Sequence, residues 1–148
     1  MCRRLGAGDR RSITAETPLP GVRSSRRSEG VRAPIPPHLY DLYGTRADDV
    51  VALTESAPGL RQPLSANYPD IAAQVVFSVR FEHCVRLSDF LRRRTLLGAS
   101  ADQGMDAARP AAELMAAELG WSRERVTGEI DAYARDVAAT QAFKGDKS

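Results

Sequence analysis

The 148-residue sequence has few of the residues from which metal centres and disulfide frameworks are built. It contains two cysteines, Cys2 and Cys84, and two histidines, His38 and His83. Two cysteines, one near the N-terminus and one in an apolar stretch, do not make a disulfide framework, and the four side chains lack metal-ligand spacing. We therefore expect two free thiols in a reducing compartment, and no metal site.

Long apolar runs are also missing. No stretch of about 18 uncharged apolar residues occurs, so no transmembrane helix is expected. The basic N-terminus is not followed by the apolar core of a secretory signal, and a cytoplasmic location is therefore expected. Gly6 and Gly8 do not complete a dinucleotide fingerprint, because Arg11 stands where its third glycine belongs and no apolar strand precedes them.

Charge is unevenly distributed along the chain. Residues 1–34 hold eight arginines and three acidic residues, whereas residues 35–148 hold 13 basic and 16 acidic residues. The first segment is rich in Arg, Ser, Gly and Pro and has no helical or strand period, which predicts a disordered basic linker or tail. It also lacks aromatic residues that could stack on bases, so nucleic-acid binding is not expected. Residues 35–148 are expected to form one domain.

The domain is predicted to be all-α, a compact bundle of about five or six helices, because no segment alternates long enough to form a strand. Pro36-Pro37 predicts the first helix start and Gly44 its end. Thr45 is expected to cap the next helix, with Asp48 as its capping-box partner. Gly120 and Ser122 should separate the last two helices.

Residues 70–97 form the centre of the chain. Their first half, from Ile71 to Val85, is apolar on nearly every side, which predicts a buried helix. A short second helix should follow, capped by Ser88. Because unpaired buried charges are costly, we expect the charged side chains here to form a structural network. Its predicted members are Arg80, Glu82, Asp89, Arg93 and Arg94.

No catalytic, cofactor-binding or metal-binding residue is predicted from these patterns. His83 and Cys84 are neighbours in sequence, but adjacent helical residues point about 100° apart and do not face each other. The arginines at 92–94 could instead contact phosphates or nucleic acid. Pairing with nearby acids is favoured, because the body of the chain is net acidic.

Three segments nevertheless occur in the order of a known domain: HLYDLYGTRADDVVAL (38–53), the central run that contains the charged residues and ELMAAELGW (113–121). They resemble the C-terminal helical domain of FAD-dependent glycerol-3-phosphate dehydrogenase, also found in alpha-glycerophosphate oxidases. The resemblance covers about residues 36–140. Residues 14–21 also resemble the T-A-x-x-P-L-P-G segment that leads out of the flavin domain in this family. Gln74 and Leu96 depart from it, since the family usually has Glu and Arg there.

The resemblance implies a role in glycerol metabolism. The full-length enzyme oxidises sn-glycerol 3-phosphate to dihydroxyacetone phosphate, and passes the hydride to FAD and the electrons to a membrane quinone. The flavin and substrate contacts lie mainly in its N-terminal domain, so this chain is expected to bind no cofactor and to be inactive alone. Its implied partner is a flavin-binding domain, through which it could reach the inner face of the membrane. The alternative is a free-standing helical interaction module whose basic tail contacts an acidic partner.

Overall fold

The computed structural model describes residues 15–17 and 34–142. Across these ranges the only pairing of strand type is an isolated bridge between Pro63 and Ile71, so the predicted all-α fold is confirmed. Residues 15–17 form a turn, and residues 1–14 and 18–33 of the predicted basic tail lie outside the described residues. The α-helices are α1 (Pro37–Tyr43), α2 (Ala47–Ser56), α3 (Ala72–Glu82), α4 (Leu87–Arg93), α5 (Met105–Leu119) and α6 (Arg123–Gln141).

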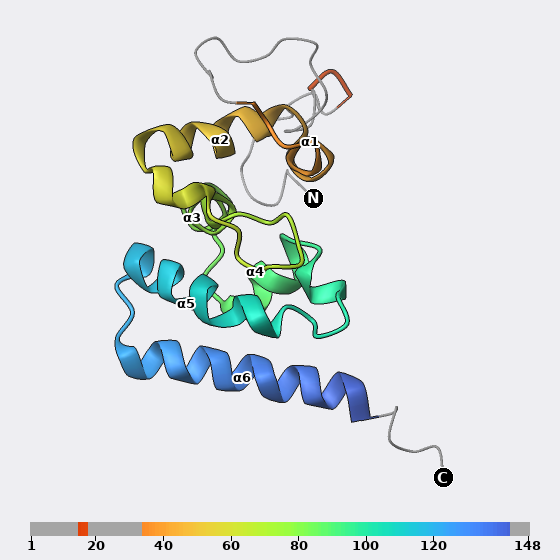
Figure 1. Cartoon of the computed structure of the whole chain (residues 1–148), viewed down its shortest axis with the longest axis vertical. Coiled ribbons are helices and arrows are strands. Elements are labelled where there is room, and N and C mark those ends of the chain that lie inside the picture. The colour runs from red at the N-terminus through yellow and green to blue at the C-terminus, as the bar shows by residue number, and fades with distance from the viewer. Residues whose placement is uncertain (1–14, 18–33, 143–148) are drawn as a thin grey trace, which may run out of the picture.

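Helix α3 occupies the middle of the molecule. In Figure 1 it is seen nearly end-on, with α1 and α2 on one side and α5 on the other. Helix α6 forms the outer layer beneath α5, and α4 packs against both of these helices. The short connections are 3₁₀ turns at Gly44–Arg46, Pro58–Arg61 and Leu97–Ala99. The fold therefore has α3 as a shared central element between two helical groups.

The buried apolar residues divide into two clusters. The larger one gathers α4, α5 and α6 with one face of α3, and includes Phe90, Met115 and Tyr133. The smaller one gathers α1 and α2 with another face of α3, and includes Leu39 and Phe77. Because α3 contributes to both clusters, seven consecutive residues of it, 72–78, are buried.

Several helix ends lie where the sequence predicts them. Pro37 begins α1, and Gly44 follows its last residue with a φ of 55°, a backbone conformation that glycine adopts readily. Gly120 ends α5 in the same way, with a φ of 68°. Ser122 then caps α6, its hydroxyl accepting a hydrogen bond from the backbone N–H of Arg125 at 3.3 Å.

Two predicted caps are wrong. The chain passes from α1 through the 3₁₀ turn into α2 without an extended residue, so Thr45 cannot cap α2. A residue that caps a helix has an extended backbone. Before α4 this residue is Arg86, whereas Ser88, the predicted cap, lies inside the helix.

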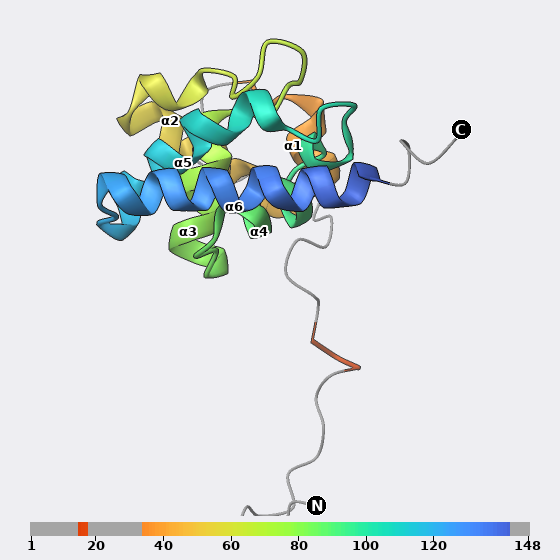
Figure 2. The ribbon, with the colours of Figure 1, turned by 90° about the horizontal axis from the view of Figure 1, so that it is seen from below.

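The central helix is also shorter than predicted and not buried along its whole length. It ends at Glu82, where His83 adopts a left-handed conformation with a φ of 54°. Phe81 and Val85 are about half exposed, because the end of α3 projects beyond the helices packed around it. Figure 2 shows this end and α4 at the edge opposite α2.

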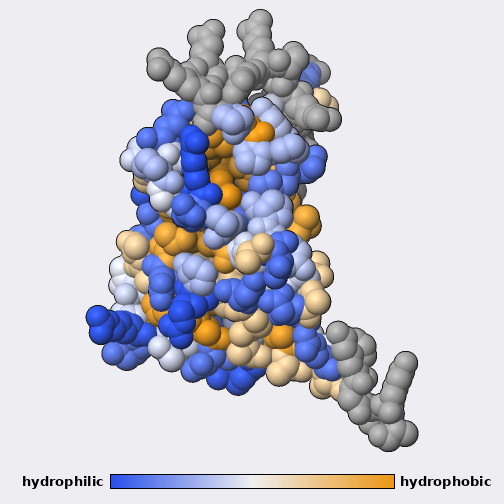
Figure 3. Space-filling model, in the orientation of Figure 1, coloured by the Kyte–Doolittle hydropathy of each residue, from blue (hydrophilic) through white to orange (hydrophobic). Residues whose placement is uncertain are grey.

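Elsewhere the apolar surface is broken up. On the face drawn in Figure 3, hydrophobic residues form small patches separated by polar side chains. Among the described helices, none combines the length and the apolar character that crossing a membrane would require.

At Gly98 the missing side chain permits close packing of two backbone segments. A Cβ atom there would lie 2.8 Å from both Arg92 Cα and Leu91 O. Gly98→Ala is therefore expected to lower the free energy of unfolding by about 1–3 kcal/mol, because backbone must move to admit the methyl group. Urea denaturation followed by circular dichroism measures the change.

Gly128→Ala is the matched control. Gly128 lies in the middle of α6 with open space around its Cα, and alanine is the better helix former by about 1 kcal/mol. This variant should be more stable than the wild type. Equal effects of the two substitutions would contradict the close approach at Gly98.

Candidate functional site

The five residues of the predicted charge network lie around the ends of α3 and α4, in separate ion pairs. Arg80 pairs with Glu118 of α5, its Nε and Nη2 donating to the two carboxylate oxygens at 2.6 and 2.8 Å. This bidentate hydrogen bonding raises the pKa of Arg80 above its ordinary value. The pair links α3 to α5, although half of the Arg80 side chain is exposed, and exposed pairs contribute little stability.

The other four residues form two further pairs. Arg94 Nη1 lies 3.3 Å from Glu82 Oε2, and its Nη2 donates to the Glu82 backbone carbonyl at 3.5 Å. Arg93 lies 3.5 Å from Asp89 on the outer face of α4. The structure therefore brings Glu82 and Arg94 together across two helices, whereas Asp89 and Arg93 are neighbours on one helix. Their structural role stays a prediction.

Sequence reasoning missed one buried carboxylate that does join separate helices. Glu129 of α6 pairs with Arg125 at 2.6 Å, and its other oxygen accepts the backbone N–H of Leu87 at 3.0 Å. Leu87 is the first residue of α4, whose free N–H groups need acceptors. The spacing Arg-x-x-x-Glu was the available sequence signal for the ion pair, but nothing local pointed to Leu87.

Gln74, one of the departures from the family pattern, lies fully buried at the start of α3. Its Oε1 accepts the backbone N–H of Ile71 at 2.8 Å, and its Nε2 donates to Asp70 Oδ1 at 3.0 Å. Burial raises the pKa of Asp70, and the hydrogen bond from Gln74 opposes this shift. The amide thus satisfies a helix N–H and a buried carboxyl at once. Leu96, the other departure, is 61% exposed.

Cys84 and His83 do not form a nucleophile pair. The thiol of Cys84 is buried and donates to the Arg86 carbonyl at 3.6 Å, whereas His83 is exposed. Burial raises the pKa of Cys84 to about 11, which leaves almost no thiolate at neutral pH. A thiol in this state is a packing group.

We expect Cys84 to resist thiol reagents in the folded protein. In a Cys2→Ser variant at pH 8, reaction with Ellman's reagent should be slow, and it should become fast in 6 M guanidinium chloride, where burial no longer raises the pKa. Repeating the assay at pH 9 should raise the rate by about tenfold, since the thiolate fraction rises tenfold per pH unit below the pKa. Rapid, pH-independent labelling of the folded variant would contradict the burial of this thiol.

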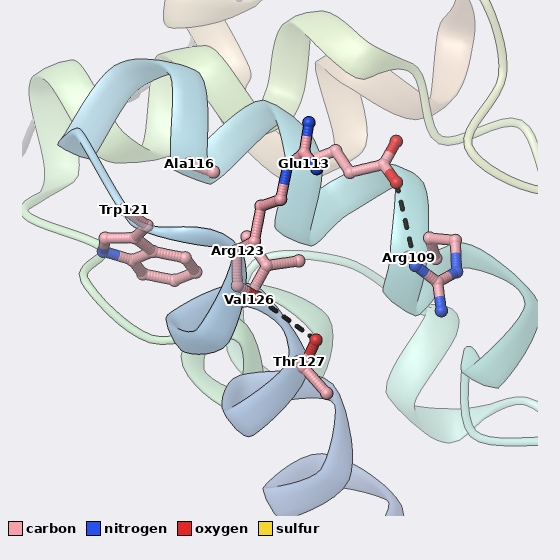
Figure 4. Close-up of a pocket in the computed structure, with 7 residues that line it drawn as sticks. All are labelled: Arg109, Glu113, Ala116, Trp121, Arg123, Val126 and Thr127. Atoms are coloured by element: carbon pink, nitrogen blue, oxygen red, sulfur yellow. Dashed lines mark hydrogen bonds and ion pairs between the residues drawn. The ribbon is translucent and has the colours of Figure 1, made fainter.

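A pocket of about 410 Å³ lies between α5 and α6. Figure 4 shows Trp121 at one end of it and Arg109 at the other, with Arg123 reaching across from the start of α6. Arg109 lies 3.9 Å from Glu113, and Arg125 stacks on the Trp121 ring at 5.5 Å. Its chemistry is that of a shallow cationic and aromatic crevice. No cysteine, histidine or serine lines it.

The described residues do not fit the flavin that the resemblance implies for the complete enzyme. A dinucleotide binds where a glycine-rich turn joins a parallel strand to a helix, with its pyrophosphate at the helix N-terminus. Residues 34–142 hold no parallel strand, since their single strand-type pairing is the isolated Pro63–Ile71 bridge, and none of their three 3₁₀ turns supplies this arrangement. Within the same residues, no group of three or more His, Cys, Asp or Glu side chains could hold a metal ion.

Comparison with known proteins identifies related domains. Residues 12–126 match the family model of the C-terminal domain of alpha-glycerophosphate oxidase. The chain is 38% identical over 97 residues to glycerol-3-phosphate dehydrogenase of Synechocystis sp., which covers 65% of the chain and 18% of that relative. It is 31% identical over 103 residues to glycerol-3-phosphate dehydrogenase 2 of Mycobacterium tuberculosis, covering 69% of the chain and again 18% of the relative.

A eukaryotic relative gives the same result. The mitochondrial glycerol-3-phosphate dehydrogenase SDP6 of Arabidopsis thaliana is 30% identical over 112 residues, which are 75% of the chain and 17% of the relative. No solved structure matches the chain. The matched stretch therefore spans less than a fifth of each of these relatives. The all-α body and its matched motifs place this chain in the family of C-terminal domains of alpha-glycerophosphate oxidase and glycerol-3-phosphate dehydrogenase.

Proposed function

We propose that the chain serves as the C-terminal helical domain of an FAD-dependent glycerol-3-phosphate dehydrogenase and acts by docking on the flavin-binding part of that enzyme. The observation that carries the proposal is the family match over residues 12–126, together with the small share of each relative that the chain spans. In this arrangement the oxidation of sn-glycerol 3-phosphate belongs to the assembled enzyme.

The chemistry of the described residues supports a non-catalytic part. The buried thiol of Cys84 is protonated, and four charged groups around α3 and α4 form two ion pairs, Glu82 with Arg94 and Asp89 with Arg93. FAD would be held by the partner, since residues 34–142 offer no strand–turn–helix cradle for its pyrophosphate. The chain would reach the membrane, where electrons pass to a quinone, only as a peripheral component on the cytoplasmic side.

Co-expression tests the proposal. The chain is produced together with the Synechocystis glycerol-3-phosphate dehydrogenase shortened by the stretch that this chain matches, and the mixture is purified through a tag on the chain. We expect the shortened flavoprotein to co-purify, and dye reduction that depends on glycerol 3-phosphate to exceed that of the shortened enzyme alone. The chain by itself should reduce no dye.

Folding of the chain must be checked in the same experiment. Circular dichroism of the purified chain should show a helical protein with a cooperative thermal transition. A folded chain that neither retains the flavoprotein nor raises its activity would refute the docking role.

A further inference from the structure

We infer that the pocket between α5 and α6 binds a small aromatic anion, in which a planar ring carries one carboxylate or phosphate group. The inference goes beyond the proposed docking role and does not depend on it. The pocket volume of about 410 Å³ falls within the range of about 300–1,000 Å³ that small-molecule sites occupy. Its lining brings an aromatic ring, aliphatic side chains and two guanidinium groups together in one hollow (Figure 4).

The aromatic end of the pocket is fixed before any ligand binds. The backbone N–H of Trp121 donates to the carbonyl of Ala116 at 3.1 Å, which ties two lining residues together where Gly120 ends α5. The guanidinium of Arg125 lies 5.5 Å from the centroid of the indole ring, and Glu129 holds this arginine at 2.6 Å. A wall that is ordered in advance loses little conformational entropy on binding, so the indole is prepared to pack against a planar ring.

The charge of the lining favours an anion. The two arginines, Arg109 and Arg123, and the one acid, Glu113, sum to +1. Arg109 and Glu113 are loosely paired, with 3.9 Å between nitrogen and oxygen and side chains that are 72% and 62% exposed. Among the described residues, no hydrogen bond or ion pair engages the guanidinium of Arg123, which reaches across the pocket in Figure 4. This guanidinium can therefore pair with a carboxylate or phosphate, whose oxygens match its parallel N–H groups.

The apolar part of the lining adds a second requirement. Ala116 and Val126 have no hydrogen-bonding side chain, and the hydroxyl of Thr127 already donates to the carbonyl of Arg123 at 3.1 Å. A free phosphate ion would leave the indole and these aliphatic groups against water, whereas a planar ring would cover them. A ring that carries an anionic group therefore satisfies the aromatic and the cationic parts of the pocket together.

Trp121 can report on the pocket directly, because it is the single tryptophan of the chain. The full chain is titrated with adenosine monophosphate and, separately, with 4-hydroxybenzoate, while tryptophan emission and the heat of binding are recorded. We expect saturable binding of at least one probe, and the probe that binds distinguishes a nucleotide from an aromatic acid. Adenosine, inorganic phosphate and 4-hydroxybenzamide lack either the anion or the ring, and each should bind at least about tenfold more weakly.

Charge variants of the lining test the position of the anion. Arg123→Gln should weaken binding at least about tenfold, since the charged hydrogen-bonding partner is lost. Glu113→Gln should tighten binding, because it removes negative charge from the lining, a direction that a purely structural role would not produce. Arg135→Gln is the matched control. It removes the same charge from an exposed position of α6 outside the pocket and should bind as the wild type does.

Three results would overturn the inference: no saturable binding of either probe, adenosine binding as tightly as its monophosphate, or unchanged affinity in Arg123→Gln. Arg109→Gln, on a side chain 72% exposed, takes the place of Arg123→Gln if circular dichroism shows that variant to be unfolded. Trp121→Leu, followed by calorimetry, should also weaken binding. Full affinity without the indole would contradict the aromatic end of the site.

Discussion

Phe77→Ala is expected to lower the free energy of unfolding by about 3–5 kcal/mol, the usual range for removing a buried aromatic ring from a core. The ring is completely buried in the smaller cluster. It packs edge-on against Tyr43 and carries the guanidinium of Arg46 over its face at 4.6 Å from the centroid. Removing it would leave a cavity where α1, the start of α2 and α3 meet.

Urea denaturation of the wild type and the variant measures this loss. Phe81→Ala is the matched control, because the same ring is removed from a position that is 53% exposed. It should cost less than about 1 kcal/mol, since little buried area is lost. Similar losses in the two variants would mean that the ring of Phe77 is not where α1 and α3 meet.

Gln74→Glu is expected to destabilise the protein by about 2–3 kcal/mol at pH 8, the order of the cost of a buried unsatisfied group. The new carboxylate would face Asp70 Oδ1 across the 3.0 Å now bridged by the amide N–H, and like charges at this distance in a buried site repel strongly. Protonation of either carboxylate would supply an O–H that can donate to the other, in place of the lost amide N–H. The pKa of the pair would therefore lie above that of the same groups in the unfolded chain.

The sign of the pH dependence follows from that shift. In the variant the folded state binds a proton more tightly than the unfolded chain does, whose carboxyl groups have a pKa of about 4. Its free energy of unfolding therefore rises as the pH falls through the raised pKa of the folded pair. The Gln74→Glu defect should thus shrink between pH 8 and pH 5 in urea titrations. Gln62→Glu makes the same change at an exposed position and should show no such recovery. A defect of constant size across this range would contradict the buried Asp70–Gln74 contact.

Local residue signals were enough to predict most helix ends. Proline at the first turn, glycine with positive φ and a serine cap act over three or four residues, so Pro37, Gly44, Gly120 and Ser122 could be interpreted without knowing the fold. Thr45 carried the same kind of signal and was interpreted wrongly. There the docking of α1 and α2 on α3 favours a continuous 3₁₀ connection over an extended cap.

The end of α3 could not be predicted because no residue there marks it. His83 takes the left-handed conformation that glycine or asparagine would usually signal. An apolar run consequently looked like one long buried helix, although its last residues are exposed. The partner of Arg80 was equally hidden, since Glu118 is 38 positions away and meets it only when α5 packs on α3.

The division of the core around α3 has a consequence for how the protein opens. Groups of helices with separate apolar clusters can exchange their amide hydrogens as separate cooperative units, with the smaller unit opening at lower free energy. The cluster that α1 and α2 form with α3 has seven buried members, against 15 in the cluster that α4, α5 and α6 form with α3. Amides of α2 should therefore exchange with deuterium through an opening that leaves α5 protected.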